Sequence, residues 1–263
     1  MQIGDLSIEP VFDGVMKAKP TAFKGSTDEQ WAPHRRFLDK DGMVELALGG
    51  FLVRGPGERL VLVDTGIGVG SGVSAGGNQY VGGELLNGLA AQGVSPDDIT
   101  DVIFTHLHFD HVGWASRAGA IVFPNATYRC DMRDWEHFLD NERVRPLLAP
   151  IEDRLQTWQG SGPLVPGIDA MMAPGHTPGS TIIVLSSGAS RGLLLGDVVH
   201  CPVELLDDEW AGLGDVDPEL AKRTRNALAR EIEGTETPVA AAHFPGMVFG
   251  RLLAANGKRS WVV

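Results

Sequence analysis

Cysteine, tyrosine and positive charge are all scarce in this chain of 263 residues. The two cysteines, Cys130 and Cys201, form neither a CxxC pair nor a zinc-finger spacing, which argues against a thiolate metal site or a dithiol redox motif. Because the sequence shows no export signal, two buried thiols are expected in place of a disulfide.

Lysine and arginine number 22 against 34 aspartates and glutamates, which gives a net charge of −12. Binding to nucleic acid or to an anionic membrane requires clustered Lys and Arg that displace counterions, so both kinds of partner are disfavoured. Apolar runs stay short of the roughly 18 residues that span a bilayer, and the first residues, Met1 to Asp5, lack the basic and apolar parts of a signal peptide. A soluble, cytoplasmic protein that acts on a small molecule is therefore expected.

The order of apolar runs and turn signals predicts an α/β fold in a single domain covering residues 1–263. Strands alternate with helices and polar side chains follow the strand ends, so the site is expected along one edge of the sheets. A glycine-rich stretch, residues 66–83, is expected to be a loop. The predicted strands are residues 46–53, 59–63, 101–105, 171–173, 181–185, 193–195 and 239–242, and the predicted helices are residues 84–92, 131–140, 143–158 and 218–233.

Residues 15–45 differ from the rest because they are polar and rich in Lys, Asp and Pro, yet they contain Phe23, Trp31 and Phe37. We interpret this segment as a lid or an interface arm outside the core. A plain surface connection is the alternative.

The most informative motif is His106-Leu107-His108-Phe109-Asp110-His111, which places four metal-binding side chains within six residues directly after a predicted strand. Three imidazoles and a carboxylate this close together would repel one another once protonated, and they would be costly to desolvate without a cation. The cluster therefore predicts a metal site.

Alternate residues of an extended segment share a side, so His106 and His108 are expected to converge on one ion, whereas Asp110 and His111 face a second position. Two dications about 3.5 Å apart repel each other, and a shared carboxylate offsets that repulsion. Asp197 is the candidate for this bridge. Three further ligand candidates share the strand-end context, and they are His176, Asp197 and His243.

Asp64 emerges from the predicted strand 59–63 into a tight turn. Its carboxylate is expected either to accept a hydrogen bond from the second nitrogen of a metal-binding imidazole or to cap the local turn.

These motifs resemble the metallo-β-lactamase superfamily, in particular Thr105 to His111, Pro174 to Gly179, Gly196-Asp197 and Ala242-His243. The resemblance implies an αββα sandwich of two packed mixed sheets with helices outside. It also implies that one metal is bound by His106, His108 and His176, that the other is bound by Asp110, His111 and His243, and that Asp197 bridges them.

Within the superfamily, the chain looks most like the branch of N-acyl-homoserine-lactone lactonases and methyl-parathion-hydrolase-like enzymes. The stretches that carry this likeness are Gly196 to His200, Ala242 to Gly246 and Phe123 to Ala126. Asp197 argues against the di-zinc β-lactamases and His108 against the flavodiiron type, while the acidic composition disfavours RNA processing. Only Lys258 and Arg259 lie near the C-terminus to bind glutathione, which weakens a glyoxalase II reading.

The expected function is that of a dinuclear metal hydrolase, a quorum-quenching lactonase or related carboxylic esterase, with two divalent ions. Zinc is the first choice, and cobalt, manganese and iron also suit these ligands. The metals would lower the pKa of a shared water from about 15.7 toward 7, and Asp110 would carry its proton to the leaving oxygen.

A neutral, fairly hydrophobic substrate is expected to contact an apolar and aromatic set consisting of Phe109, Trp114, His200, Phe244 and Met247. Each of these residues has packing as its alternative role. His200 stands three residues after Asp197, where the best-known lactonases have a tyrosine, so phosphotriester or aryl-ester hydrolysis is the first alternative.

A mononuclear iron enzyme of the persulfide dioxygenase type is the second alternative, and a non-catalytic binding protein the least favoured, since it would not need all seven ligands. The resemblance also implies a homodimer through the N-terminal segment.

Overall fold

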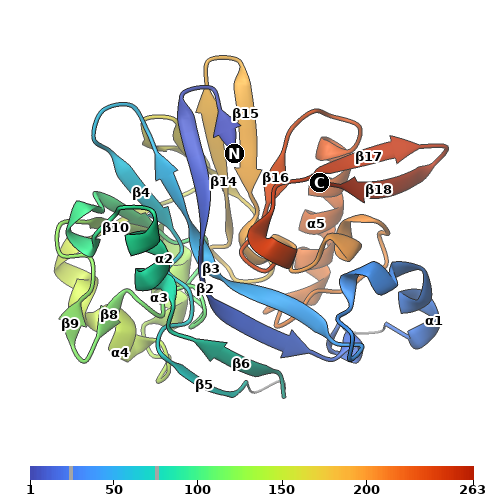
Figure 1. The fold of residues 1–263 in the computed structure, drawn as a ribbon, viewed down its shortest axis with the longest axis horizontal. Helices are drawn as coiled ribbons and strands as arrows, with labels where there is room; N and C mark the ends of the chain where they lie inside the picture. The colour runs from blue at the N-terminus through green and yellow to red at the C-terminus, as the bar shows by residue number, and fades with distance from the viewer. Residues whose placement is uncertain (24–25, 75–76) are drawn as a thin grey trace.

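The computed structural model describes residues 1–23, 26–74 and 77–263. Most of the strands in these ranges form two mixed sheets (Figure 1). The first sheet runs in the order β11 (Leu155–Trp158), β10 (Thr127–Asp131), β7 (Asp101–Ile103), β4 (Leu60–Val63), β3 (Val44–Arg54), β2 (Leu6–Ala18), β6 (Gln79–Gly82) and β5 (Gly70–Val73), and β1 (Gln2–Ile3) pairs with β2. The second sheet runs in the order β12 (Gly162–Val165), β13 (Ile168–Met172), β14 (Thr181–Ser187), β15 (Ser190–Leu194) and β16 (Val239–Ala240).

Short elements complete the described part of the chain. Two hairpins lie outside the sheets, and they pair β8 (Ser116–Arg117) with β9 (Ala120–Ile121) and β17 (Arg251–Ala255) with β18 (Lys258–Val262). The helices are α1 (Asp28–Trp31), α2 (Leu85–Ala91), α3 (Met132–Phe138), α4 (Arg145–Leu148) and α5 (Pro218–Ile232).

The two sheets pack face to face with helices on their outer faces, which confirms the predicted αββα sandwich. Strands β4 and β14 show how the sequence specifies this arrangement, because they are apolar on both faces. Val63 and Ile183 belong to the core cluster between the sheets, whereas Leu62 packs toward α2 and α3 and Ile182 toward α5. Burial on both faces of a strand requires such continuous apolar runs.

Two expectations about local structure were wrong. Within residues 66–83 the chain forms the β5–β6 hairpin, which extends the first sheet, so this glycine-rich stretch is more than a loop. The predicted helix 143–158 is instead the single turn α4, a 3-10 segment from Ala149 to Arg154, and strand β11. Pro150 lacks a backbone N–H, and Leu155–Trp158 gain a parallel ladder with β10, which outweighs their weak helical periodicity.

The aromatic side chains of residues 15–45 belong to the core. Phe23, Trp31 and Phe37 are buried in the cluster that also contains Trp210, and the Trp31 and Trp210 rings lie 4.9 Å apart. The interpretation of these side chains as lying outside the core was therefore wrong. The roles of the segment as a lid and as a dimerisation arm stay predictions, as does the single-domain assignment.

Cys130 and Cys201 are buried free thiols, as expected. Within the described ranges, no helix combines the length and the apolar composition that crossing a bilayer requires.

Candidate metal centre

The chemically active side chains follow the ends of four strands that meet at one edge of the two sheets. The loop after β7 carries the histidine motif, the loop after β13 carries His176, and Asp197 and His243 follow β15 and β16. Because the parallel pair β15 and β16 deliver their carboxyl ends to the same place, residues distant in sequence converge there.

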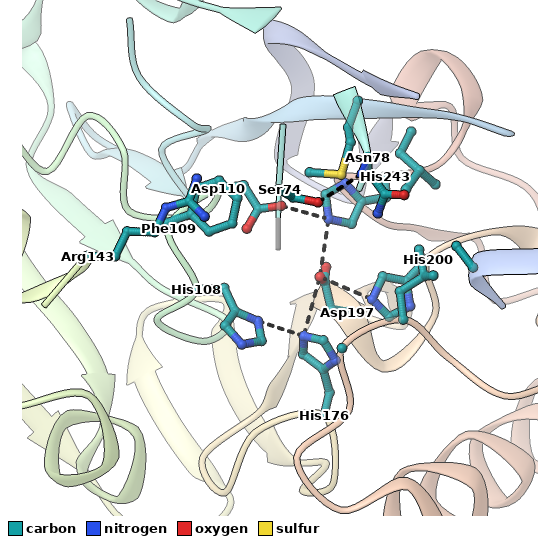
Figure 2. Close-up of a pocket in the computed structure, with 15 residues that line it drawn as sticks. Ser74, Asn78, His108, Phe109, Asp110, Arg143, His176, Asp197, His200 and His243 are labelled. Carbon is teal, nitrogen blue, oxygen red and sulfur yellow. Dashed lines mark hydrogen bonds and ion pairs between the residues drawn. The ribbon is translucent and has the colours of Figure 1, made fainter. Parts of the chain in front are cut away.

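The first group of ligand atoms comes from His106, His108, His176 and Asp197. His108 Nδ1 lies 3.0 Å from His106 Nε2 and 2.8 Å from His176 Nε2. Asp197 Oδ2 lies 3.7 Å from His106 Nε2 and 3.5 Å from His176 Nε2. Figure 2 shows His108, His176 and Asp197 pointing toward one another.

The second group consists of Asp110, His111 and His243. His243 Nε2 is 3.4 Å from His111 Nε2 and 3.6 Å from Asp110 Oδ2. Asp197 reaches this group as well, with Oδ1 3.2 Å from His111 Nε2 and Oδ2 3.2 Å from His243 Nε2. The structure thus brings all seven predicted ligands together, with Asp197 in contact with both groups.

These donor atoms fit two divalent cations. Tetrahedral coordination with metal–nitrogen bonds near 2.0 Å places neighbouring donors about 3.3 Å apart, and the separations above bracket that value. Asp197 Oδ1 is buried between the two groups. His111 Nε2 lies 3.2 Å away, but the oxygen accepts no hydrogen bond from the described residues. A buried carboxylate oxygen without a partner is costly unless a cation or proton binds it.

The charge states of His106, His108 and Asp197 agree with this fit. Burial lowers the pKa of His106 and His108 well below the usual histidine value, which leaves their nitrogen lone pairs free to bind a cation. Burial opposes the charge on Asp197, but the neighbouring imidazoles of His111 and His243 hold its pKa well below the usual range, so it stays ionised. Burial likewise opposes a proton on His111, yet the carboxylates of Asp197 and Asp64 raise its pKa well above the usual value, so a metal ion bound at the second group would have to displace that proton.

Asp64 contacts a ligand imidazole through the nitrogen that faces away from the metal position. His111 Nδ1 donates to Asp64 Oδ2 at 2.9 Å, and Thr105 donates to the same carboxylate through its backbone N–H and its hydroxyl, each at 2.8 Å. Asp64 has a φ of 61°, in the left-handed region, which is strained for a residue with a side chain. The Asp64 carboxylate thus contacts the imidazole, as the first alternative expected, and none of its hydrogen bonds among the described residues caps the local turn.

Sequence reasoning missed Asp215, which plays the corresponding part for another ligand. Asp215 Oδ1 accepts a hydrogen bond from His176 Nδ1 at 3.0 Å, and Arg225 Nη2 lies 3.5 Å from Asp215 Oδ2. Arg225 is buried and also contacts Glu204 Oε1 at 3.3 Å. Asp215 lies 39 residues from His176 with no recognisable motif between them, so no sequence signal identifies it.

Asp134 was also missed. It is fully buried, and its carboxylate accepts hydrogen bonds from Leu107 N at 3.0 Å, from Thr177 Oγ1 at 2.9 Å and from Gly179 N at 2.6 Å. Burial raises its pKa above the ordinary value even though these hydrogen bonds lower it. Asp134 ties the histidine loop to the loop that carries His176.

A cavity of about 380 Å³ opens above the ligands (Figure 2). Of the residues predicted to bind substrate, Phe109 and His200 line this cavity. His200 Nε2 is 3.4 Å from Asp197 Oδ2. Its wall also contains residues that the sequence reasoning missed, among them Met16, Leu46 and Arg143.

The structure places the other predicted substrate contacts elsewhere. Trp114 is buried, and its Nε1 donates to Asp13 Oδ1 at 2.8 Å. Asp13 also accepts from the backbone amides of four residues between 67 and 85, so it organises the chain around the β5–β6 hairpin. Gly66, with a φ of 61°, packs against Asp13 so closely that a Cβ would lie 2.5 Å from its carboxylate.

Phe244 packs against Trp261 with ring centroids 5.2 Å apart, and Met247 is buried in the core between the sheets. Both residues therefore have the packing role that was the alternative to substrate contact.

Removing the Asp215 carboxylate should weaken metal binding at the first group. In Asp215→Asn the amide keeps the size of the side chain but no longer anchors the His176 ring with an ionised acceptor. Loss of a carboxylate that hydrogen-bonds to a metal-binding imidazole typically lowers metal affinity by about 10- to 100-fold. Competition with a fluorescent chelator should show that loss of affinity for one of the two metal equivalents. The control, Asp169→Asn on β13, should bind both equivalents as the parent protein does. Unchanged metal affinity in Asp215→Asn would contradict the role of Asp215 in orienting His176.

Comparison with known proteins agrees with the geometry. The model of the metallo-beta-lactamase superfamily matches residues 50–243. An N-acyl homoserine lactonase from Bacillus thuringiensis is 29% identical over 155 residues, which is 59% of this chain and 59% of that protein. The match therefore spans less than two thirds of that curated relative.

Two solved structures are similar over this whole chain. One is AidC, a dizinc quorum-quenching lactonase in complex with a product, N-hexanoyl-L-homoserine, with a TM-score of 0.87, 24% identity and 95% of its chain covered. The other is the hydrolase AbOPH of the beta lactamase superfamily, also with a TM-score of 0.87, at 27% identity and 95% coverage. The first likeness supports the fold alone.

Proposed function

This chain belongs to the metallo-beta-lactamase superfamily, and we propose that it is a dinuclear metal-dependent hydrolase that opens lactones or cleaves related carboxylic esters. The observation that carries the proposal is the position of Asp197, whose two oxygens contact both groups of ligand atoms. A mononuclear enzyme of the persulfide dioxygenase type would not need the second group.

The residues divide between holding the cations and handling the substrate. His106, His108 and His176 would hold one cation, the second group would hold the other, and Asp197 would bridge them. Two divalent ions bound there supply the Lewis acidity that makes water nucleophilic near neutral pH and offsets negative charge on the substrate oxygen.

Asp110 is proposed to move the proton. It follows Phe109 directly, lines the cavity, and is 7% exposed, so its carboxylate reaches both the ligands and the substrate space. A carboxylate in this position takes a proton from the attacking water and returns it to the leaving oxygen.

Phe109 and His200 are proposed to contact the substrate, with Met16 and Leu46 providing apolar wall. The cavity is thus suited to a partly apolar ester, in line with the lactonase from Bacillus thuringiensis and the product complex of AidC. His200 Nε2 lies 3.4 Å from Asp197 Oδ2, so an imidazole stands beside the proposed bridge at the position where the best-known lactonases have a tyrosine. This position favours phosphotriester or aryl-ester hydrolysis as the second candidate.

Metal analysis and a turnover panel test the proposal together. The protein should bind two equivalents of zinc, cobalt or manganese and should cleave members of a panel of acyl-homoserine lactones, simple lactones, aryl esters and phosphotriesters. The class with the highest kcat/KM decides between the two candidates. One equivalent of iron with oxygen-dependent activity, or two equivalents of metal with no turnover of any class, would contradict hydrolysis of these bonds.

A further inference from the structure

Arg143 stands at the mouth of the cavity above the metal ligands and is exposed. Its guanidinium carbon lies 3.3 Å from the centroid of the Phe109 ring and 5.8 Å from that of Tyr80. Phe109 and Arg143 also line a second cavity of about 340 Å³ beside the β5–β6 hairpin, so the pair forms a wall shared by both spaces. Figure 2 shows Arg143 and Phe109 next to Asp110.

The guanidinium keeps most of its donors. Stacking on Phe109 uses the face of the group, whereas its five N–H bonds lie in the plane and point outward from its edge. Among the described residues, Arg143 makes one side-chain hydrogen bond, from Nη2 to the Tyr80 hydroxyl at 3.3 Å, and no carboxylate lies within 4.0 Å of its nitrogens. Some other arginines, such as Arg133 and Arg259, are by contrast paired with carboxylates.

The backbone at Arg143 is held by a hydrogen-bonded turn. Asn141 Oδ1 accepts hydrogen bonds from the backbone amides of Arg143 and Val144, which holds the turn that leads into α4. Phe109 lies between His108 and Asp110 in the metal-binding loop, so the ring under the guanidinium is anchored to the site itself. Because the guanidinium already contacts Phe109 and Tyr80, less side-chain freedom is left to lose when an acceptor binds.

From these contacts we propose that Arg143 is a specificity-determining residue that binds an oxygen acceptor of the substrate away from the scissile bond. The proposal rests on the proposed hydrolase function. The acceptor is a carboxylate or an amide carbonyl, and the carboxylate is bound more strongly because the hydrogen bonds are then charged on both sides. The substrate is therefore an ester or lactone with a polar group on its far side, which refines the neutral, apolar ester expected from the sequence.

Three matched substrates test the proposal. They are the 4-nitrophenyl esters of heptanoic acid, of adipic acid monoamide and of adipic acid, which present a methyl group, an amide and a carboxylate at the far end of one chain length. The metal-loaded protein should prefer them in the order carboxylate, amide, methyl. In Arg143→Met, kcat/KM should fall by about 30-fold for the carboxylate and about 5-fold for the amide, mostly through KM, but by less than about 2-fold for the methyl ester.

Two further variants sharpen the result. Arg143→Lys keeps the charge but loses the planar fork, so it should retain part of the preference for the carboxylate. Arg154→Met, at an exposed position outside the cavity, should behave as the parent protein. An equal fall of kcat/KM for all three esters in Arg143→Met, or no fall for any, would overturn the proposal.

Calorimetry separates this inference from the proposed function. Metal-loaded protein and Arg143→Met are titrated with straight-chain dicarboxylates from succinate to suberate and with the monocarboxylate hexanoate. At least one dicarboxylate should bind the parent about 10-fold more tightly than it binds Arg143→Met, with hexanoate unchanged. If no ester is cleaved, the hydrolase proposal fails while this titration still decides the role of Arg143. Equal dicarboxylate affinities in both proteins, or no binding to the parent, would overturn that role.

Discussion

Replacing Asp197 with asparagine is expected to abolish the paired metal site and to lower turnover by about 1,000-fold or more. Asparagine has nearly the same shape, so the change removes charge and one oxygen donor without opening a cavity. The carboxylate lies within 3.7 Å of imidazoles from both groups, namely His106, His111, His176 and His243, and it is buried. Without it, no carboxylate would lie between the two dications to offset their repulsion.

Two quantities are measured. The first is the metal content per chain, by mass spectrometry after dialysis has removed the unbound metal. The second is kcat/KM on the best substrate of the panel. Both should fall in the same variant. Asp153→Asn, at an exposed position, is the matched control and should retain two metals and full activity. An Asp197→Asn protein with full metal content and full turnover would show that the bridging role is wrong.

The sequence identified the residues that converge at the candidate metal centre because their chemistry is local to strand ends. His106, His108 and His111 are recognisable in one short motif, and Asp197 follows from the need for an anion between two cations. Asp64 was identifiable because its carboxylate leaves a buried strand and enters a tight turn. Asp215 was not identifiable from the sequence. Its contact with His176 requires the segment between β15 and α5 to fold back onto His176, and no periodicity in the sequence indicates such a contact.

The errors in the predicted elements have a similar cause. Helix propensity and strand propensity differ by tenths of a kcal/mol per residue, so a ladder partner decides the outcome. Residues Leu155–Trp158 became β11 because the exposed edge of β10 was available to them. Phe23 and Trp31 looked like part of a polar arm because the partner that buries them, Trp210, is remote in sequence.

Arg225→Met is expected to destabilise the protein by about 3–5 kcal/mol, since it leaves two buried carboxylates without their cation. Arg225 is 1% exposed. Its Nε donates to Val198 O at 3.0 Å, its Nη1 donates to Trp210 O at 3.2 Å, and its guanidinium lies between Glu204 and Asp215. Methionine fills much of the volume, so the loss measures electrostatics more than packing.

Urea unfolding of the metal-loaded protein provides the measurement, with the exposed Arg223→Met on the same helix as the control. Combining Arg225→Met with Glu204→Gln should recover part of the loss, because the stranded charge is then removed as well. If Arg225 acted by packing alone, the losses of unfolding free energy in Arg225→Met and Glu204→Gln would add in the double variant. A loss of unfolding free energy below about 1 kcal/mol in Arg225→Met would contradict the electrostatic role.

The pH dependence of that loss follows from the sign of the Glu204 pKa shift. Burial raises the pKa of Glu204, but Arg225 and His200 together lower it by more than burial raises it. The pKa in the folded protein therefore lies below the ordinary value. A carboxylate with a depressed folded pKa stabilises the protein above its unfolded pKa of about 4.3, and this contribution is lost as the pH falls through the folded pKa. The difference in unfolding free energy between the parent and Arg225→Met should therefore be full near pH 7 and shrink below about pH 4. A difference that stays constant between these pH values would show that Arg225 stabilises this region through its backbone contacts rather than through the charge of Glu204.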